Sequence, residues 1–134
     1  MLIKVEILPW LSSSMRPEAT GKILEEDKTV GVDGYLVYQM NCWNHVSQPV
    51  VASGKPTLFA DFQYGGSGGF LVYTSGYLRN KAPNFAFVAS TRMEDLVAAV
   101  RCFEKVKSGG SEAFVAAVTQ LRKKRTPAPD DLAC

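Results

Sequence analysis

The sequence has few of the residues from which metal sites and disulfide frameworks are usually built. Its 134 residues include one histidine, and its three cysteines, Cys42, Cys102 and Cys134, form no CxxC pair. An odd number of cysteines without such a pair fits neither a disulfide framework nor a zinc site. It favours a reducing compartment, so we expect a cytoplasmic protein.

Charge of one sign and long apolar runs are scarce as well. Fifteen basic residues stand against 13 acidic ones, which gives a net charge of +2. Nucleic acids and anionic membranes attract clustered positive charge, so we expect neither as a partner. No run approaches the ~18 apolar residues of a membrane span, and the N-terminus shows no signal-peptide pattern. With 46% apolar and 21% charged residues, the composition is that of a folded globular domain.

Four short apolar runs have the character of β-strands. They are rich in β-branched and aromatic residues, are bounded by Gly, Pro, Asn or Asp, and cover Leu2–Leu8, Gly34–Met40, Pro56–Phe62 and Asn84–Ala89. Their hydrophobicity is nearly continuous rather than alternating. That pattern indicates strands covered on both faces, as in a parallel sheet.

Helical patterns lie between these runs. The first helix has Ser14 as cap and Pro17 in its first turn, and a short second one has Ser47 as cap, Pro49 in its first turn and Gly54 after its end. A third begins at Ser67, and its expected buried face consists of Phe70, Thr74, Tyr77 and Leu78.

Two further helices follow the last apolar run. Thr91 and Glu94 form a capping box for the fourth helix. Its apolar stripe consists of Met93, Leu96, Val97, Val100 and Phe103. Gly109 and Gly110 interrupt it before a last helix with Phe114, Val115, Val118 and Leu121 on its buried face.

This order of elements predicts the α/β fold class. We expect a doubly wound, Rossmann- or flavodoxin-like parallel sheet of about four strands in a three-layer αβα arrangement. Residues 1–125 form a single domain in this prediction, and residues 126–134, with two prolines and no periodicity, form a linker or a disordered tail.

Ligands of open parallel sheets bind beyond the carboxyl ends of the strands. Three loops are predicted at that edge, residues 9–14, 41–45 and 63–69. The third places four glycines and a serine between a strand and a helix, which leaves backbone N–H groups at a helix N-terminus for a phosphate or a sugar hydroxyl. Its candidate binding residues are Gln63, Tyr64, Gly65, Gly66 and Ser67.

The same loop matches neither of two phosphate-binding motifs. Leu71 occupies the third position of G-x-G-x-x-G, and the P-loop lysine is absent. GGSGG satisfies the nucleophile-elbow pattern around Ser67, but no histidine follows it in the chain. A glycine-rich turn that only lets strand and helix pack closely remains open.

The loop at residues 41–45 carries the other candidates. Trp43 can stack on the apolar face of a sugar, while Asn44 and His45 can supply directional hydrogen bonds. The alternative is that Trp43 covers the core edge and His45 lies on the surface. Acidic residues are scattered, so we assign no catalytic residue and no metal ligand to this chain. The basic run Arg122–Arg125 is expected to be a solvated helix end.

Three segments resemble the amino-terminal region of the L-fucose and L-arabinose isomerase superfamily. They are Gly34–Trp43 (GYLVYQMNCW), Gly54–Ser67 (GKPTLFADFQYGGS) and Val88–Val100 (VASTRMEDLVAAV), and the likeness covers about residues 2 to 107. By this resemblance Trp43 corresponds to a tryptophan that contacts sugar. The family's members are oligomeric aldose–ketose isomerases that use Mn²⁺, and their metal ligands come from domains further along a much longer chain.

The resemblance implies a substrate-side or oligomerisation domain of a sugar-isomerase-like protein, not catalytic in isolation and looking like a fragment of a longer chain. The resemblance implies no cofactor in this chain itself and Mn²⁺ in the parent protein. The implied partners are a sugar or polyol, shared with another domain or subunit, and further copies in a homo-oligomer. Two alternatives stay open: a flavodoxin-like module that binds phosphate or a nucleotide on the glycine-rich loop, and a pure assembly domain.

Overall fold

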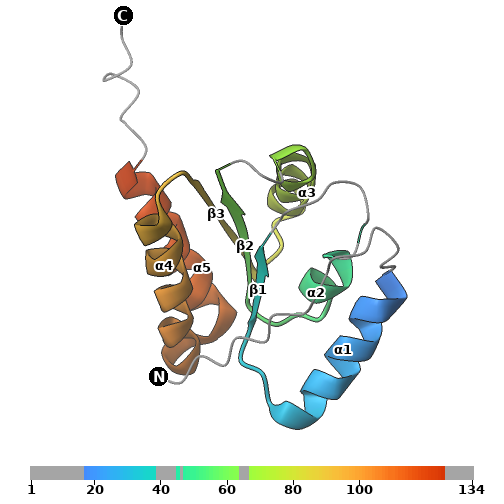
Figure 1. Cartoon of the computed structure of the whole chain (residues 1–134). Helices are drawn as coiled ribbons and strands as arrows, with labels where there is room; N and C mark the ends of the chain where they lie inside the picture. Colours follow the sequence, from blue (N-terminus) through green and yellow to red (C-terminus); the bar gives the residue numbers. More distant parts are fainter. Residues whose placement is uncertain (1–16, 39–44, 46, 64–66, 126–134) are drawn as a thin grey trace, which may run out of the picture.

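The structure of the chain is a computed structural model that describes residues 17–38, 45, 47–63 and 67–125 (Figure 1). Its strands are β1 (Tyr35–Tyr38), β2 (Thr57–Phe62) and β3 (Phe85–Ser90). They form one parallel sheet in the order β1-β2-β3. Three of the predicted strands are thereby confirmed. The fourth prediction, Leu2–Leu8, lies outside the described residues, so the described sheet has three strands where about four were expected.

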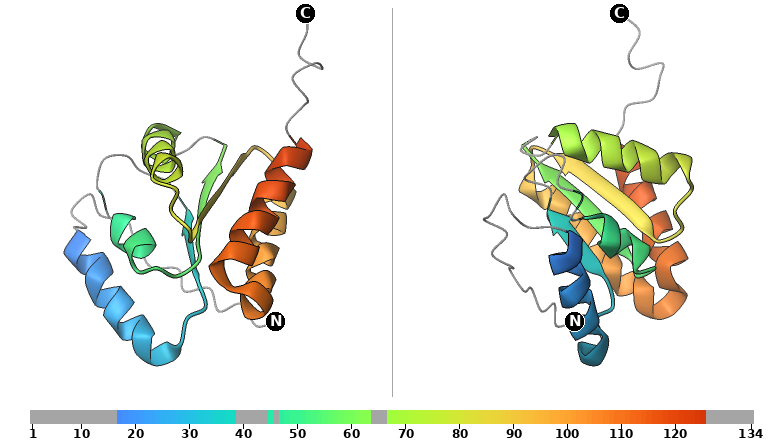
Figure 2. Two further views of the ribbon diagram at one scale, coloured as in Figure 1. Left: turned by 180° about the vertical axis from the view of Figure 1, so that it is seen from behind. Right: turned by 90° about the vertical axis from the view of Figure 1, so that its right-hand side faces the viewer.

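The helices form a layer on each face of the sheet, which confirms the three-layer αβα arrangement (Figures 1 and 2). One layer consists of α1 (Pro17–Val30), α2 (Gln48–Ala52) and α3 (Ser67–Arg79). The other consists of α4 (Met93–Arg101) and α5 (Val106–Arg125), joined by the 3₁₀ turn η1 (Cys102–Lys105). Alternating strands and helices produce this architecture because parallel strands need crossover connections, which cover the sheet.

Each face of the sheet carries its own hydrophobic core. On one face Leu58 and Val88 pack with Leu96 of α4 and with Phe114 and Val118 of α5. The opposite core is largely aromatic and consists of Phe59 and Phe85 with Val51, Phe70 and Tyr73. Leu58 and Phe59 both have an exposed fraction of 0%. The continuous hydrophobicity of the predicted run Pro56–Phe62 therefore does indicate a strand that is covered on both faces.

β1 departs from that expectation. Leu36 and Tyr38 are 46% and 42% exposed, because α4 packs on β2 and β3 and leaves the same face of β1 open. A continuous apolar run thus corresponds here to a strand that the described helices cover on one side only. The hydrophobic pattern alone does not distinguish these two cases.

The helix boundaries follow the local signals with two corrections. Ser47 is the N-cap of α2 and Pro49 lies in the first turn, as predicted, but the Ser47 hydroxyl makes no capping hydrogen bond. Gly54, with φ 78°, follows the helix as expected. The predicted capping box of Thr91 and Glu94 is wrong, since Arg92 is the N-cap of α4 and no side chain caps that helix.

Two predicted buried faces are also partly wrong. In α3, Tyr73 is buried, whereas Leu78 is 50% exposed. In α4, Met93 and Val97 are exposed and only Leu96 and Ala99 are buried. For α4 the reason is the same as for β1. The helix lies over β2 and β3, so the side of its apolar stripe that faces β1 is not covered by any described element.

Gly34, which directly precedes β1, lies against Phe103, a residue that packs on the core of the α4–α5 face. A Cβ atom built on it would lie 2.6 Å from a ring carbon of Phe103 and 2.7 Å from the carbonyl oxygen of Pro56. That carbonyl also accepts the hydrogen bond from the Tyr35 N–H at 2.8 Å, so it has little freedom to move. Position 34 therefore has no room for a larger side chain than that of glycine.

We predict that Gly34→Ala lowers the free energy of unfolding by about 1–3 kcal/mol, since overpacking forces backbone and ring to shift. The matched control is Gly76→Ala in the interior of α3, where a Cβ meets nothing within 4 Å. That change is expected to raise the free energy of unfolding by about 0.5–1 kcal/mol, because alanine favours a helix over glycine. Urea denaturation measures both, and equal effects of the two substitutions would contradict this packing.

Candidate functional site

The carboxyl ends of the parallel strands meet at one edge of the sheet, the location at which such folds bind ligands. Two of the predicted site residues are described at this edge. His45 lies on the connection from β1 to α2, and Gln63 directly follows β2. Both have a left-handed backbone, with φ values of 57° and 53°. Such conformations are uncommon for residues other than glycine and concentrate at functional loops.

His45 is held by residues of the first helical layer. Its backbone N–H donates to the Tyr73 hydroxyl at 3.4 Å, and the two rings lie 5.8 Å apart between centroids. Its Nδ1 atom lies 3.0 Å from Nε2 of Gln48. With that amide nitrogen as donor, the neutral imidazole carries its proton on Nε2. The exposed ring of His45 then presents an N–H donor to solvent.

Two buried hydroxyl groups lie next to this contact in the sequence. Ser47 is two residues from His45, and Thr74 is adjacent to Tyr73 on the buried side of α3. Their exposed fractions are 4% and 5%. Neither Ser47 Oγ nor Thr74 Oγ1 has a hydrogen-bond partner in the part of the chain that the structure describes. Buried polar groups are nearly always paired, so unpartnered ones need a specific explanation.

Gln63 is fixed through its backbone rather than its side chain. Its N–H donates to the carbonyl oxygen of Ser90 at 3.0 Å, which continues the pairing of β2 with β3 by one residue. The Gln63 side chain is exposed. Among the described residues no hydrogen bond or ring contact joins Gln63 to His45. The structure thus places both at one edge of the sheet without bringing their side chains together.

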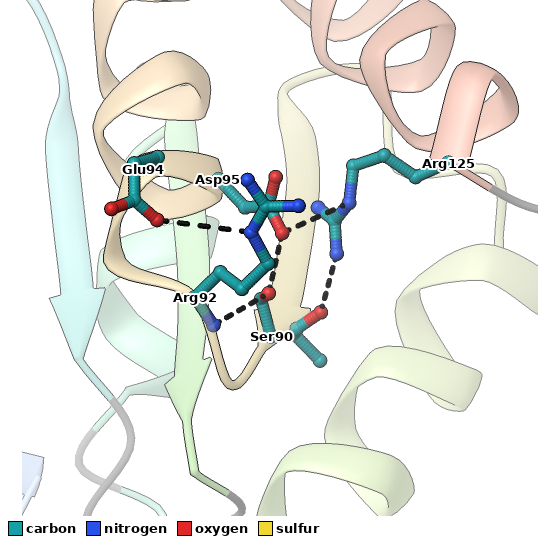
Figure 3. A network of polar contacts seen from close by, with 6 residues as sticks. Ser90, Arg92, Glu94, Asp95 and Arg125 are labelled. Carbon is teal, nitrogen blue, oxygen red and sulfur yellow. Dashed lines mark hydrogen bonds and ion pairs between the residues drawn. The ribbon is translucent and has the colours of Figure 1, made fainter.

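The carboxyl end of β3 carries a polar network that links three elements (Figure 3). Ser90 Oγ donates to Asp95 Oδ2 at 2.6 Å and accepts from the Arg92 N–H at 3.0 Å. Arg125 Nε lies 3.3 Å from the same Asp95 oxygen, and its Nη2 donates to the Ala89 carbonyl at 3.0 Å. The Asp95 carboxylate therefore connects the end of β3, the first turn of α4 and the last turn of α5.

The basic run at the end of α5 is only partly solvated, which corrects the expectation for Arg122–Arg125. The Arg122 guanidinium lies 3.7 Å from the centroid of the Phe87 ring. Burial and the neighbouring charge of Arg125 lower the pKa of Arg122. Phe87, Ala89, Arg122 and Arg125 line a shallow hollow at the outer edge of β3. Lys123 and Lys124 are exposed, as predicted.

Several predicted site residues lie outside the described residues, namely Trp43, Asn44, Tyr64, Gly65 and Gly66. Ser67 begins α3, as expected from the loop-to-helix pattern. Sequence reasoning did not identify Tyr73, Ser47 or Thr74 as possible site residues. A serine at a helix cap and a threonine within a helix are common, and only their burial without partners distinguishes them here.

The described residues offer little support for a metal site, a reactive thiol or a membrane span. No group of three or more His, Cys, Asp or Glu side chains there is close enough to hold a metal ion, so no manganese site can be assigned to these residues. Burial raises the pKa of the Cys102 thiol, which disfavours the reactive thiolate. None of the described helices has both the length and the apolar character needed to cross a membrane.

Neither the protein-family models, nor the curated proteins, nor the solved structures gave a significant match to the chain.

The network at the end of β3 provides a test of what holds this edge of the sheet together. We predict that Asp95→Asn lowers the free energy of unfolding by about 1–2 kcal/mol, because Ser90 and Arg125 lose a shared charged acceptor. The control is Glu94→Gln at the adjacent position, where the carboxylate lies 3.8 Å from Arg92 and both side chains are mostly exposed. That change is expected to stay within about 0.5 kcal/mol. Urea denaturation at neutral pH compares them, and a cost for Glu94→Gln as large as that for Asp95→Asn would be inconsistent with this assignment.

Proposed function

We propose that the chain is a sugar- or polyol-contacting domain of a sugar-isomerase-like protein, and that it is not catalytic in isolation. The ligand site lies at the carboxyl edge of the sheet, beside His45 and Tyr73. The observation that carries the proposal is that two buried hydroxyls, those of Ser47 and Thr74, have no hydrogen-bond partner among the described residues and lie close in the sequence to His45 and Tyr73. The resemblance of the chain to the L-fucose and L-arabinose isomerases agrees with it.

The chemistry of this corner suits a polyhydroxylated ligand. Sugar hydroxyls both donate and accept hydrogen bonds, and so do the hydroxyls of Ser47, Thr74 and Tyr73. The Tyr73 oxygen accepts from the His45 N–H, which leaves its own proton available as a donor. His45 adds a directional N–H group at the surface. Such a set of neutral donors and acceptors fixes the orientation of a ligand without needing a charge.

The catalytic steps of an aldose–ketose isomerase are not assigned to this chain. Such a reaction moves a proton between two adjacent carbons, and it needs a base and an electrophile placed at those carbons. In this proposal the described residues bind and orient the sugar, and another domain or subunit supplies the base and the Mn²⁺. The role of Trp43 in stacking on the sugar stays a prediction, since this residue lies outside the described residues.

A second candidate is an anion-binding module, and one observation favours it. Arg122 and Arg125 line the hollow at the outer edge of β3, and Phe70 near the start of α3 contacts the Phe87 ring beneath it, with centroids 5.9 Å apart. The N-terminal part of α3 and two guanidinium groups therefore lie near one end of the sheet. Both favour negative charge. Stabilisation by phosphates or nucleotides, with no effect of sugars, would select this candidate.

The proposal predicts an unusual pair of effects for one substitution. Thr74→Val removes a buried hydroxyl without a partner, so we expect it to raise the melting temperature of the free chain. The same change should reduce the additional stabilisation by L-fucose or L-arabinose, because the sugar loses a partner. A gain of stability that accompanies a loss of binding is typical of a binding site.

A control and a reference sugar make the comparison specific. Thr57→Val also replaces a buried threonine, but its hydroxyl donates to the Lys55 carbonyl at 2.9 Å, so its loss should destabilise the chain and leave the sugar response unchanged. Any polyol at high concentration stabilises proteins through exclusion from their surface. The meaningful quantity is therefore the difference between L-fucose and sucrose for each variant, measured by thermal denaturation. An unchanged difference in Thr74→Val would argue against the site.

A further inference from the structure

The described helices leave part of one face of the sheet uncovered. Val37 packs on the aromatic core, so its neighbours Leu36 and Tyr38 point to the opposite face, toward the layer of α4 and α5. Their register partners on β2 are Leu58 and Ala60, which belong to the core under that layer. Leu36 and Tyr38 themselves are exposed. The apolar face of the sheet therefore continues on β1 beyond the helices that cover it.

α4 adds an apolar flank to the same surface. Met93 and Val97 lie one helical turn apart and are 50% and 44% exposed. A shallow hollow follows this side of the helix, and its lining residues are Met93, Glu94, Val97, Ala98 and Arg101. Residues three and four positions apart share one face of a helix, so the last four of these form a single stripe. Contiguous exposed apolar surface of this kind is typical of an interaction site.

The two ends of the stripe carry opposite charges. Glu94 lies in the first turn of α4 and Arg101 in its last turn, about 10 Å apart along the helix axis. The Glu94 carboxylate has a long contact of 3.8 Å with Arg92, and both of these side chains are mostly exposed. Arg101 is exposed and forms no ion pair with any residue that the structure describes. Both charged groups can therefore reach a partner on this face.

We propose that this surface is the contact between two copies of the chain, which pack their α4 helices antiparallel around a two-fold axis. An axis that passes between Val97 and Ala98 is equally far from Glu94 and from Arg101. Glu94 of each copy then lies opposite Arg101 of the other, with apolar side chains between the two ion pairs. A two-fold interface must be complementary to itself, and this stripe meets that condition. A parallel packing would bring like charges together.

The second copy also covers the open part of the sheet. α4 and α5 pack on β2 and β3, so the helix of the second copy, lying beside α4, comes to rest over Leu36 and Tyr38 of β1. The resemblance to the isomerases implies a homo-oligomer but does not say which surface forms it. His45 and Tyr73 belong to the opposite face of the sheet, so this inference does not depend on the proposed sugar site.

Sedimentation velocity of the full chain tests the inference. The concentrations should span about 1 µM to 1 mM, since a contact made by one short helix and one strand is small. We expect a reversible equilibrium between monomer and dimer. Val97→Asp places a charge at the centre of the contact and should raise the dissociation constant at least about 10-fold. The matched control is Leu71→Asp, which introduces the same charge at an exposed leucine of α3 and should leave the equilibrium unchanged.

Reversal of the two charges tests the antiparallel pairing itself. Glu94→Arg and Arg101→Glu each place like charges opposite one another at both ends of the contact. Each change alone should therefore raise the dissociation constant at least about 10-fold. The double variant restores opposite charges, so its dissociation constant should return to within about threefold of that of the unmodified chain. A different partner on this face would not give this recovery.

Three results would overturn the proposal. A chain that stays monomeric over the whole range would assign the face to another occupant, such as an undescribed segment of the same chain or a different domain. Equal effects of Val97→Asp and Leu71→Asp would place the contact elsewhere. A double variant as weak as the two single variants would exclude the pairing of Glu94 with Arg101. Should Val97→Asp fail to fold, the charge-reversal variants decide, because both side chains that they replace are exposed.

Discussion

The burial of β2 on both faces is the constraint on which the rest of the structure depends. Leu58 and Phe59 are adjacent in the chain and point to opposite cores, and neither has exposed surface. Neighbouring strands on both sides and helices above and below are needed to achieve this. At its amino end the strand is further fixed by Asn84, whose carbonyl accepts from the Thr57 N–H and whose amide donates to the carbonyls of Val51 and Lys55. At the carboxyl end, the Gln63 N–H continues the pairing with β3 through the Ser90 carbonyl, so both ends of β2 are joined to β3.

The two faces of the sheet are closed in different ways. On the α4–α5 face, aliphatic residues of the strands meet Phe114 and Val118, and the Asp95 network fixes the ends of both helices to β3. On the other face, aromatic rings pack edge to face, as Phe59 does with Phe85 at 5.0 Å between centroids. His45, which precedes α2, and Tyr73 of α3 also contact each other on that face. Tyr73 therefore belongs both to this aromatic core and to the contact with His45.

Local patterns in the sequence predicted most of the described fold. The apolar runs at β2 and β3, Pro49 after Ser47 and the interruption at Gly109–Gly110 each depend on neighbouring residues only. The structure agrees with them, since α5 is kinked at Gly109 and Gly110, whose backbone angles are not helical. The errors occur where an element distant in the sequence determines whether a side chain is buried or which partner it contacts. Met93, Val97 and Leu36 are apolar yet exposed, because α4 does not extend over β1. Glu94 was predicted as the capping-box partner of Thr91. The contacts of Asp95 with Ser90 and Arg125 were not predicted, because Arg125 is distant in the sequence and its position there has no local signal.

The edge of the sheet at which the candidate residues lie was predictable, but the contacts that they make there were not. The rule that ligands bind at the carboxyl edge identified His45 and Gln63, and both have strained backbones there. Tyr73, Ser47 and Thr74 were not identified, because their significance depends on burial and on the absence of partners within the described residues. The prediction that Arg122 is solvated is wrong, since a run of basic residues does not reveal that one guanidinium covers the Phe87 ring. Pairing of this kind is a property of the folded chain.

The central claim is that a sugar or polyol binds where His45 and Tyr73 meet at the carboxyl edge. The most direct measurement is a titration of the ¹⁵N-labelled chain with L-fucose or L-arabinose, followed by backbone amide NMR shifts. The account predicts that the largest changes occur at His45, Ser47, Gln63, Tyr73 and Thr74. Changes confined to the opposite edge, around Lys55 and Asn84, or no change with any sugar, would contradict it.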